Sequence, residues 1–342
     1  MTVNLRSVAE RAGVSVRTVS NVVNNFPHVA ADTRAAVQKV LDELGYRPNL
    51  AARQLRRGRT GAIALVVPEV DSPYFAELAA VIVRLAESRG WTVLIDQTAG
   101  DAERERRLAT GPTTHMVDGM IFSPWSLRPQ ELAGRTNGVP MVLIGERGAD
   151  GPIDHVAIDN VGAAAAATEH LIATGRQRIA AIGLQPHLAN NTSRLRLAGY
   201  RQALQRNGRA EVPEWEIAVR SLHRADGSQA MQQLLNLNLD PAPDAVFCFT
   251  DELALGALRT LADHSRKVPD DVALVGFDDI QDGRFSIPRL TTVAPDKEQI
   301  ARNCLELLAG RLEHAEGPAV SRLAPYTLQV RESSTPESSW KG

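Results

Sequence analysis

Short apolar runs alternate with helical patterns through residues 61–335, and this alternation restricts the possible folds more than any other feature. Ala62–Val67 is the first run, and its unbroken apolar sequence is typical of a strand buried on both faces. Strand–helix alternation predicts parallel sheets with right-handed crossovers. We therefore predict an α/β fold with two doubly wound parallel-sheet subdomains. Further strands are expected at 92–95, 119–122, 141–144, 178–182, 245–249 and 272–276, and helices at 75–89, 161–173, 195–206, 253–263 and 297–308.

Charge is unevenly distributed along the 342 residues, whose formal net charge is −2. Residues 1–60 hold ten basic and four acidic side chains, a balance of +6 that leaves −8 for the rest. A basic module on an acidic body is the electrostatic pattern of a nucleic-acid-binding protein. A basic, solvated face without a partner would have the same composition.

Residues 5–44 show three short helical patterns. The first ends at Gly13, the second starts after Ser15 as its N-cap, and the third runs from about 32 to 44. The turn between the first two has about three residues, the length of a helix-turn-helix. Arg17 and Asn21 lie opposite the apolar face of the second helix, so they could reach into a groove. A generic three-helix bundle with both residues merely solvated is the alternative.

Residues 48–60 connect this module to the body. Asn49 is a good N-cap for a short helix that contains Ala52 and Leu55, but seven residues are too few to be helical alone in water. We expect the segment to fold only when docked, with Leu55 as an apolar wedge in a widened minor groove. An ordinary interdomain linker is the alternative.

The stretches LRSVAERAGVSVRTVSNVVNN and TRAAVQKVLDELGYRPNLAARQL resemble the lactose repressor family of bacterial transcription regulators, and the likeness covers essentially the whole chain. It implies that the second helix reads bases and that two hinge helices meet in the minor groove. Arginine suits guanine, asparagine suits adenine and valine can touch a thymine methyl. The predicted DNA-binding residues are Ser15, Val16, Arg17, Thr18, Ser20, Asn21, Asn24, Asn49, Ala52 and Leu55.

The resemblance also implies the domain organisation. A helix-turn-helix domain is expected at 1–47, a hinge helix and linker at 48–60, an effector-binding and dimerisation domain at 61–335, and a polar tail at 336–342. The large domain would consist of two subdomains of periplasmic-binding-protein type, joined by crossovers near Asp159, Pro288 and Val320. The expected N-subdomain spans about 61–158 and 291–320, and the C-subdomain about 159–290 and 321–335.

Ligand-binding residues are expected where strands end, because ligands of doubly wound sheets bind at the carboxyl ends of strands. Aromatic plates together with arginine and carboxylates suit a sugar. By resemblance, RLRLAGY places Arg196 at a ligand-binding arginine and VGFDD places Asp278 at a hydroxyl-binding aspartate. Thr250 and Gly145 depart from the family pattern, and Asp251 could brace a loop instead. The predicted effector-binding residues are Asp71, Tyr74, Phe75, Gln97, Ser123, Trp125, Arg147, Arg196, Thr250, Asp251 and Asp278.

The chain lacks the sequence motifs of several functional classes. The chain has no Walker A, HExxH, GxSxG or dinucleotide motif, so we expect no enzyme, cofactor or catalytic metal. Cys248 and Cys304 lie far apart, and neither belongs to a metal-binding pattern. No apolar stretch is long enough for a signal core or a membrane span, which predicts a cytoplasmic protein without a membrane partner.

The predicted function is a ligand-responsive transcription regulator, in its simplest form a repressor of carbohydrate-utilisation genes. It would bind palindromic double-stranded operator DNA as a homodimer, because the tail after Arg331 lacks the leucine heptads of a tetramer-forming coil. A purine or sugar-phosphate ligand and a corepressor mechanism are open alternatives. So are a solute-binding or enzymatic α/β protein with an incidental basic arm and an architectural DNA protein, although the large body argues against the last. The sequence specifies neither the effector nor the operator.

Overall fold

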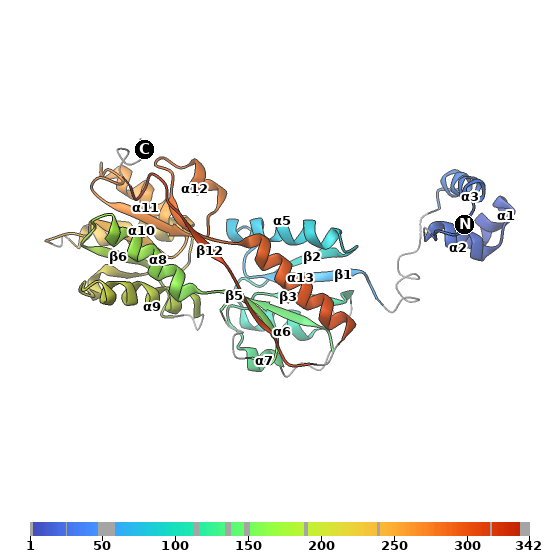
Figure 1. Ribbon diagram of the computed structural model, residues 1–342, viewed down its shortest axis with the longest axis horizontal. Helices are drawn as coiled ribbons and strands as arrows, with labels where there is room; N and C mark the ends of the chain where they lie inside the picture. Colours follow the sequence, from blue (N-terminus) through green and yellow to red (C-terminus); the bar gives the residue numbers. More distant parts are fainter. Residues whose placement is uncertain are drawn as a thin grey trace. The chain divides into compact units, whose positions relative to one another are not determined.

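The chain folds into two compact units, Met1–Thr60 and Gly61–Gly342. The computed structural model, shown in Figure 1, describes residues 3–24, 26–46, 59–111, 116–133, 138–146, 151–187, 191–237, 240–314 and 317–335. The hinge residues Asn49, Ala52 and Leu55 and the ligand candidate Arg147 lie outside these ranges.

The first unit contains the three predicted helices, α1 (Leu5–Ala12), α2 (Val16–Val23) and α3 (Ala31–Glu43). Gly13 ends α1 in the left-handed conformation, with φ of 65°, as the sequence predicts. The Ser15 hydroxyl accepts a hydrogen bond from the Thr18 backbone N–H at 3.1 Å and so caps α2. Val8, Val19 and Val37, one from each helix, are fully buried and form the small core.

The second unit contains two sheets, each with six described strands. Their orders are β11-β5-β4-β3-β1-β2 and β12-β10-β9-β8-β6-β7, and every described pairing is parallel except that of β10 with β12. In both sheets the strand order reverses, between β1 and β3 and between β6 and β8, which is the signature of doubly wound sheets. The first sheet comprises β1 (Ala62–Val67), β2 (Thr92–Gln97), β3 (Gly119–Phe122), β4 (Met141–Ile144), β5 (Asp154–Ile158) and β11 (Ser321–Ala324), and the second β6 (Ile179–Leu184), β7 (Glu216–Ala218), β8 (Ala245–Cys248), β9 (Ala273–Phe277), β10 (Thr291–Pro295) and β12 (Tyr326–Gln329).

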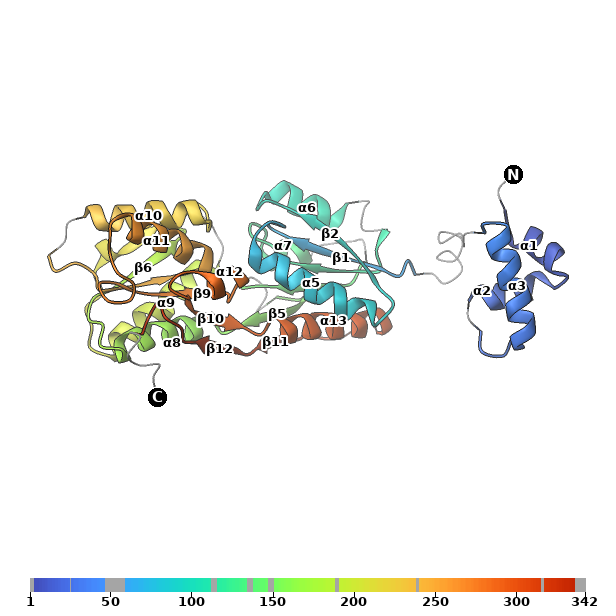
Figure 2. The same cartoon turned by 90° about the horizontal axis from the view of Figure 1, so that it is seen from above.

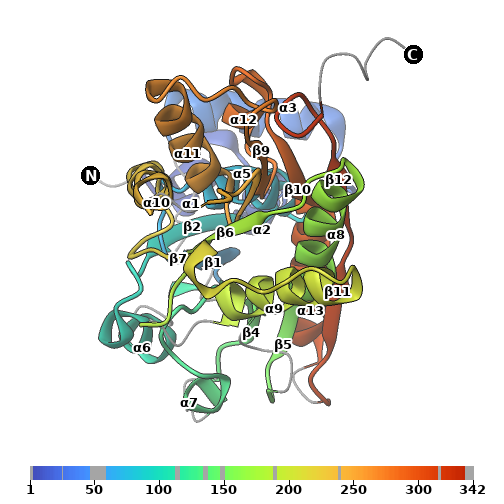
Figure 3. The same cartoon turned by 90° about the vertical axis from the view of Figure 1, so that its left-hand side faces the viewer.

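Helices cover both faces of each sheet. Beside the first sheet are α5 (Pro73–Glu87), α6 (Ala102–Thr110), α7 (Pro129–Ala133) and α13 (Lys297–Glu313), and α5 and α13 lie side by side in Figure 2. The second sheet lies between α8 (Asn160–Ala173) with α9 (Asn191–Arg206) and α10 (Arg224–Asn236) with α11 (Asp251–Asp263), as Figure 3 shows. The short helices are α12 (Gln281–Phe285) and a 3-10 turn at Pro213–Trp215. No helix in the described ranges has the length and apolarity needed to span a bilayer.

Two of the three predicted crossovers lie later in the chain than expected. The chain crosses near Asp159 as predicted, but β10 pairs with β9, so residues 291–295 belong to the second sheet. Likewise β11 pairs with β5, so residues 321–324 belong to the first sheet and the last crossover falls before β12. Each strand completes its backbone pairing before the chain crosses, which leaves only a short segment between the subdomains.

Helices α10 and α11 pack so closely that Gly256 of α11 leaves no room for a side chain. A Cβ atom there would lie 1.9 Å from the carbonyl oxygen of Arg224 on α10. We therefore expect Gly256→Ala to lower the free energy of unfolding by about 1–3 kcal/mol through overpacking. Gly310→Ala in α13 is the control, because its Cβ would meet nothing within 4 Å, and it should stabilise by up to about 1 kcal/mol. The tryptophans all lie after residue 60, so urea unfolding followed by their fluorescence measures this unit alone; equal stability of the two variants would contradict the packing argument.

Candidate DNA-reading helix and ligand cleft

The polar side of α2 is the candidate DNA-reading surface. Val19 and Val22 are buried in the core of the unit, whereas Val16 and Arg17 are exposed and Asn21 is half-buried. Among the described residues, no acid pairs with Arg17, and the side chains of Arg17 and Asn21 make no hydrogen bonds. Their donors therefore remain available to a partner, as base reading requires.

The other predicted residues of this helix engage mainly in its own hydrogen bonds. The hydroxyls of Ser15 and Thr18 lie 2.9 Å apart, and the Asn24 side chain donates to the Ser20 backbone carbonyl at 2.7 Å. Such bonds fix the two ends of the helix. This geometry favours Val16, Arg17 and Asn21 as the readers, with the remaining four residues as supports.

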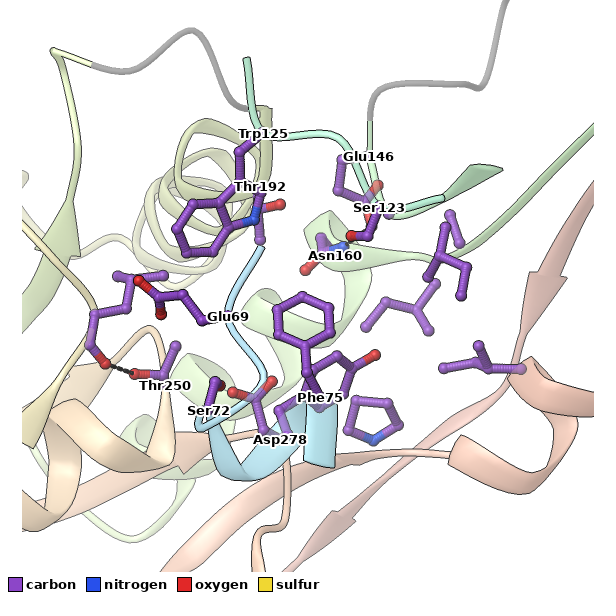
Figure 4. Close-up of a pocket in the computed structure, with 18 of the residues that line it drawn as sticks. Glu69, Ser72, Phe75, Ser123, Trp125, Glu146, Asn160, Thr192, Thr250 and Asp278 are labelled. Atoms are coloured by element: carbon purple, nitrogen blue, oxygen red, sulfur yellow. Dashed lines mark hydrogen bonds between the residues drawn. The ribbon is translucent and has the colours of Figure 1, made fainter. Parts of the chain in front are cut away.

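A cavity in the second unit brings together seven of the eleven predicted effector residues. Both sheets contribute to its lining. Figure 4 shows Phe75 and Trp125 between a side with Glu69 and Thr250 and a side with Ser123, Glu146 and Asn160. The predicted residues that line the cavity are Tyr74, Phe75, Ser123, Trp125, Arg196, Thr250 and Asp278.

The aromatic side chains of the cavity are held by their local structure. Pro73 opens α5 and is suited to this position, because its missing N–H would have no helical partner there. Phe75 follows within the first turn of α5. Glu105, a buried residue of α6, accepts the Trp125 backbone N–H at 2.6 Å and the Leu127 N–H at 2.8 Å. A carboxylate from α6 thus fixes the loop that carries the indole.

Arg196 is the only arginine among the cavity-lining residues described, and its guanidinium is fixed in place. Its Nε donates to Asn160 Oδ1 at 2.8 Å and its Nη1 donates to the Phe249 carbonyl. The guanidinium carbon lies 3.5 Å from the centre of the Phe277 ring, and Nη2 lies 3.6 Å from Asp278 Oδ1. Burial lowers the pKa of Arg196, against the opposing effect of the nearby carboxylates. The group is therefore pre-organised for a ligand that accepts or shares its hydrogen bonds.

Asp278 lies at a strained turn after β9, with φ of 112°. Lys297 holds this turn, because its Nζ donates to the backbone carbonyls of Asp278 at 2.7 Å and Asp279 at 3.1 Å. Lys297 also donates to Glu77 Oε2 at 2.7 Å. The lysine therefore connects α5 to the turn that presents the Asp278 carboxylate to the cavity.

Burial shifts the acids of the cavity towards their neutral forms. It raises the pKa of Glu146 to about 7 and that of Asp278 to about 6, although Arg196 opposes both shifts. Burial also raises the pKa of Glu69 and of Glu252. A ligand that donates hydrogen bonds would stabilise the charged carboxylates and lower these pKa values again.

The raised pKa of Glu146 predicts a pH-dependent stability. The folded state binds this proton more tightly than the unfolded state, whose glutamate has a pKa near 4.5, so the contribution is complete below that pH and disappears as pH rises through about 7. We expect the free energy of unfolding to fall between pH 5.5 and 7.5, and to fall less in Glu146→Gln. Urea titrations at three pH values measure this difference, and equal slopes for the two proteins would refute it.

Three of the predicted residues, Asp71, Gln97 and Asp251, do not line the cavity. Asp251 is fully buried and accepts hydrogen bonds from Thr292 Oγ1 at 2.6 Å and the Ile280 N–H at 2.9 Å, so it braces the turn after β9. Gln97 accepts the Val70 N–H at 3.2 Å. Asp71 is exposed on the loop before α5. Asp251 and Gln97 hold loops in place, which is the alternative that the sequence left open for Asp251.

Several cavity residues were absent from the predicted set. Glu146, Ser72 and Thr192 follow strand ends, and the strand-end rule indicates them as well as the residues of that set. Asn160, which donates to the Glu146 carboxylate, begins α8 after the first crossover. Glu69 and Glu252 also lie within a few residues of strand ends, those of β1 and β8, whereas no pattern in the sequence indicated His223.

The fold and the two sites together define a class of protein: a helix-turn-helix DNA-binding unit joined to a two-subdomain unit with a ligand cleft. Residues 4–49 match the model for bacterial regulatory proteins of the lacI family, and residues 168–334 match that for a periplasmic binding protein-like domain. The chain belongs to the lacI family. It is a ligand-responsive, DNA-binding transcription regulator and not an enzyme.

Relatives resemble the chain over nearly its whole length. The HTH-type transcriptional repressor CytR of Escherichia coli K12 is 34% identical over 96% of this chain and 95% of its own. The lac repressor dimer bound to operator and the anti-inducer ONPF has a TM-score of 0.82 at 29% identity, covering 98% of this chain and 100% of that one. The complex of the regulator CelR with cellobiose has a TM-score of 0.72 at 32% identity, covering 97% and 99%.

Proposed function

We propose that this regulator is a repressor whose effector is a non-phosphorylated saccharide, or a molecule of similar hydroxyl content, bound between the two subdomains. The observation that carries the proposal is the lining of the cleft, where the rings of Phe75 and Trp125 accompany the side chains of Arg196, Asn160 and Asp278. Aromatic rings pack against the CH faces of sugars, and charged groups form strong hydrogen bonds with hydroxyls. The CelR–cellobiose complex supports the same ligand class.

The charges of the cleft argue against the sugar-phosphate alternative. Glu69, Glu146, Glu252 and Asp278 line it, and Arg196 is the one arginine or lysine among the described lining residues. A phosphate would meet an excess of carboxylates, which is unfavourable at short range in a partly buried site. A neutral or cationic ligand with many donors fits this lining better.

Control of DNA binding is proposed to follow from the two-subdomain construction. A ligand that contacts both subdomains favours one angle between them, and in a dimer this angle sets the separation of the two hinge segments 48–60. A coupling of about 1–3 kcal/mol, typical of allosteric proteins, changes DNA affinity about 5- to 150-fold. We propose release of DNA by the effector, as expected for a repressor of sugar utilisation.

The dimer is proposed to form through the edge strand β2 of the first sheet. Leu94 on this strand is 44% exposed, and Ile95 beside it is exposed too. Because exposed apolar edge strands favour association, Leu94→Asp should shift the protein towards monomer. Leu323→Asp is the matched control, because Leu323 is 65% exposed on β11, the opposite edge of the same sheet. Analytical ultracentrifugation measures the oligomeric state of both variants. If Leu323→Asp is monomeric and Leu94→Asp is not, β2 is not the dimer surface.

The proposal as a whole is tested by adding neutral mono- and disaccharides to a complex of the protein with its selected duplex. A saccharide that lowers DNA affinity at least fivefold and raises the melting temperature of the protein supports it. Tight DNA binding that no saccharide changes, while a purine or a sugar phosphate does, would reject the ligand class. DNA affinity that does not depend on salt would instead favour the solute-binding alternative.

A further inference from the structure

One corner of the cleft holds an imidazole between two carboxylates from opposite walls. Glu69 follows β1 of the first subdomain, whereas His223 precedes α10 and Glu252 lies on α11 of the second. His223 Nε2 lies 3.4 Å from Glu69 Oε1, and His223 Nδ1 lies 3.8 Å from Glu252 Oε2. All three side chains line the cavity. We call this set the acidic corner.

The acidic corner contains more negative than positive charge. Besides His223, its cation is Arg224, whose Nη1 lies 3.0 Å from Glu252 Oε1 and whose Nη2 lies 3.3 Å from Asp282. Arg224 is therefore shared between Glu252 and Asp282. Burial raises the pKa of Glu69; His223 opposes this shift, and the negative charges of Asp71 and Asp226 add to it.

The donors of His223 do not satisfy all the hydrogen-bond acceptors of Glu69 and Glu252. A neutral imidazole has one N–H to donate, so it can serve one of the two carboxylates at a time. In either protonation state the contact of Nδ1 with Glu252, at 3.8 Å, is too long for a hydrogen bond. The corner thus offers more acceptor capacity than its own donors use.

A second acceptor is directed into the same cavity, independently of this corner. Asp278 is only 8% exposed, and no donor from the described residues forms a hydrogen bond with its carboxylate; the guanidinium of Arg196 is 3.6 Å away. Figure 4 shows Asp278 and Glu69 at the same cavity. Arg196 therefore gives this carboxylate an ion pair but no hydrogen bond, and a ligand rich in donors would supply the missing hydrogen bonds.

We propose that the effector is a saccharide-like molecule with a protonated amine, and that Glu69 and Glu252 bind this amine in the acidic corner. The inference rests on the proposed function in one respect, namely that the effector occupies this cleft. An ammonium group has three donors and no acceptor, so it matches the two carboxylates, Glu69 and Glu252. A hydroxyl at the same position has one donor and no charge, and it would form weaker bonds with the two carboxylates.

Paired ligands that differ only in the amine test this inference. Titration calorimetry at pH 6.5 compares glucosamine with glucose, galactosamine with galactose, and the disaccharide of two glucosamines with cellobiose. We expect the amine to bind roughly tenfold or more tightly than its hydroxyl partner in at least one pair, as one charge-assisted contact would give. Glu69→Gln should abolish this preference, and Glu252→Gln provides a second variant in case the first does not fold.

Asp71→Asn is the matched control, because the negative charge of Asp71 acts on Glu69 but Asp71 does not line the cavity. It should keep the preference for the amine. The inference is overturned if the hydroxyl partners bind as tightly as the amines, or if Glu69→Gln leaves the preference unchanged. Binding and DNA release by neutral sugars alone would reject the amine and keep the proposed function. Binding of neither series would reject both.

Discussion

Replacing Arg17 by alanine is expected to weaken specific DNA binding by roughly 1–3 kcal/mol at each half-site, which is about 5- to 150-fold. A dimer uses two copies, so the loss counts twice on a palindromic duplex. The physical reason is that the exposed guanidinium can donate two hydrogen bonds to the O6 and N7 atoms of a guanine. Selection from a random duplex library, followed by affinity measurement, should show a relaxed preference at one position of each half-site.

Lys39→Ala is the control for this experiment. Lys39 is an exposed base on α3, within 4.0 Å of Glu43, and it lies on a different helix from the predicted readers. Its loss removes the same charge as the loss of Arg17, so it should change affinity uniformly across sequences if at all. Unchanged base preference in Arg17→Ala, or the same relaxed position in both variants, would refute the reading role of Arg17.

Replacing Arg196 by alanine is expected to abolish the response to the effector while DNA binding persists. The side chain lines the cleft and contacts Asn160, the Phe249 carbonyl and Asp278, so its removal should deprive the ligand of a donor and of pre-organised neighbours. The ligand-induced rise in melting temperature and the ligand-induced change in DNA affinity should both disappear.

Arg201→Ala separates this effect from a general loss of stability. Arg201 lies on the same helix, but its guanidinium is 2.6 Å from the Glu216 carboxylate, and neither residue lines the cleft. It should keep the full ligand response. Arg196→Lys keeps the positive charge but not the planar set of donors, and it is a second variant in case the alanine variant does not fold. A normal ligand-induced shift in Arg196→Ala would count against its role.

Much of the fold could be predicted because buried strands of parallel sheets are apolar throughout. The predicted bounds of β1, β3 and β4 are confirmed to the residue. The strand β5 escaped prediction, because it begins with Asp154 and His155, which are charged or polar but buried. Asp154 is neutralised by Arg311 on α13, with two contacts of 2.7 Å across 157 residues of sequence. A tertiary ion pair of this kind leaves no local pattern.

Site residues that directly follow strands could be predicted from the sequence. Residues whose side-chain direction depends on tertiary packing could not. Thr250 and Asp251 are adjacent, yet Thr250 caps α11 and lines the cavity whereas Asp251 turns inward to Thr292. The exact start of the helix separates the two roles, and periodicity does not fix such a start to one residue. His223 lies before α10, a helix outside the predicted set, so its approach to Glu69 could not be inferred from the sequence.

The central claim is that α2 reads a palindromic duplex and that occupancy of the cleft changes this binding. The most direct measurement is duplex selection with the purified, full-length protein at low ionic strength, repeated with the ligand that the cleft binds. We predict enrichment of one palindrome, steep loss of affinity with added salt, and an affinity at least fivefold lower with the ligand. A folded, dimeric protein that enriches no palindrome under either condition would contradict the account.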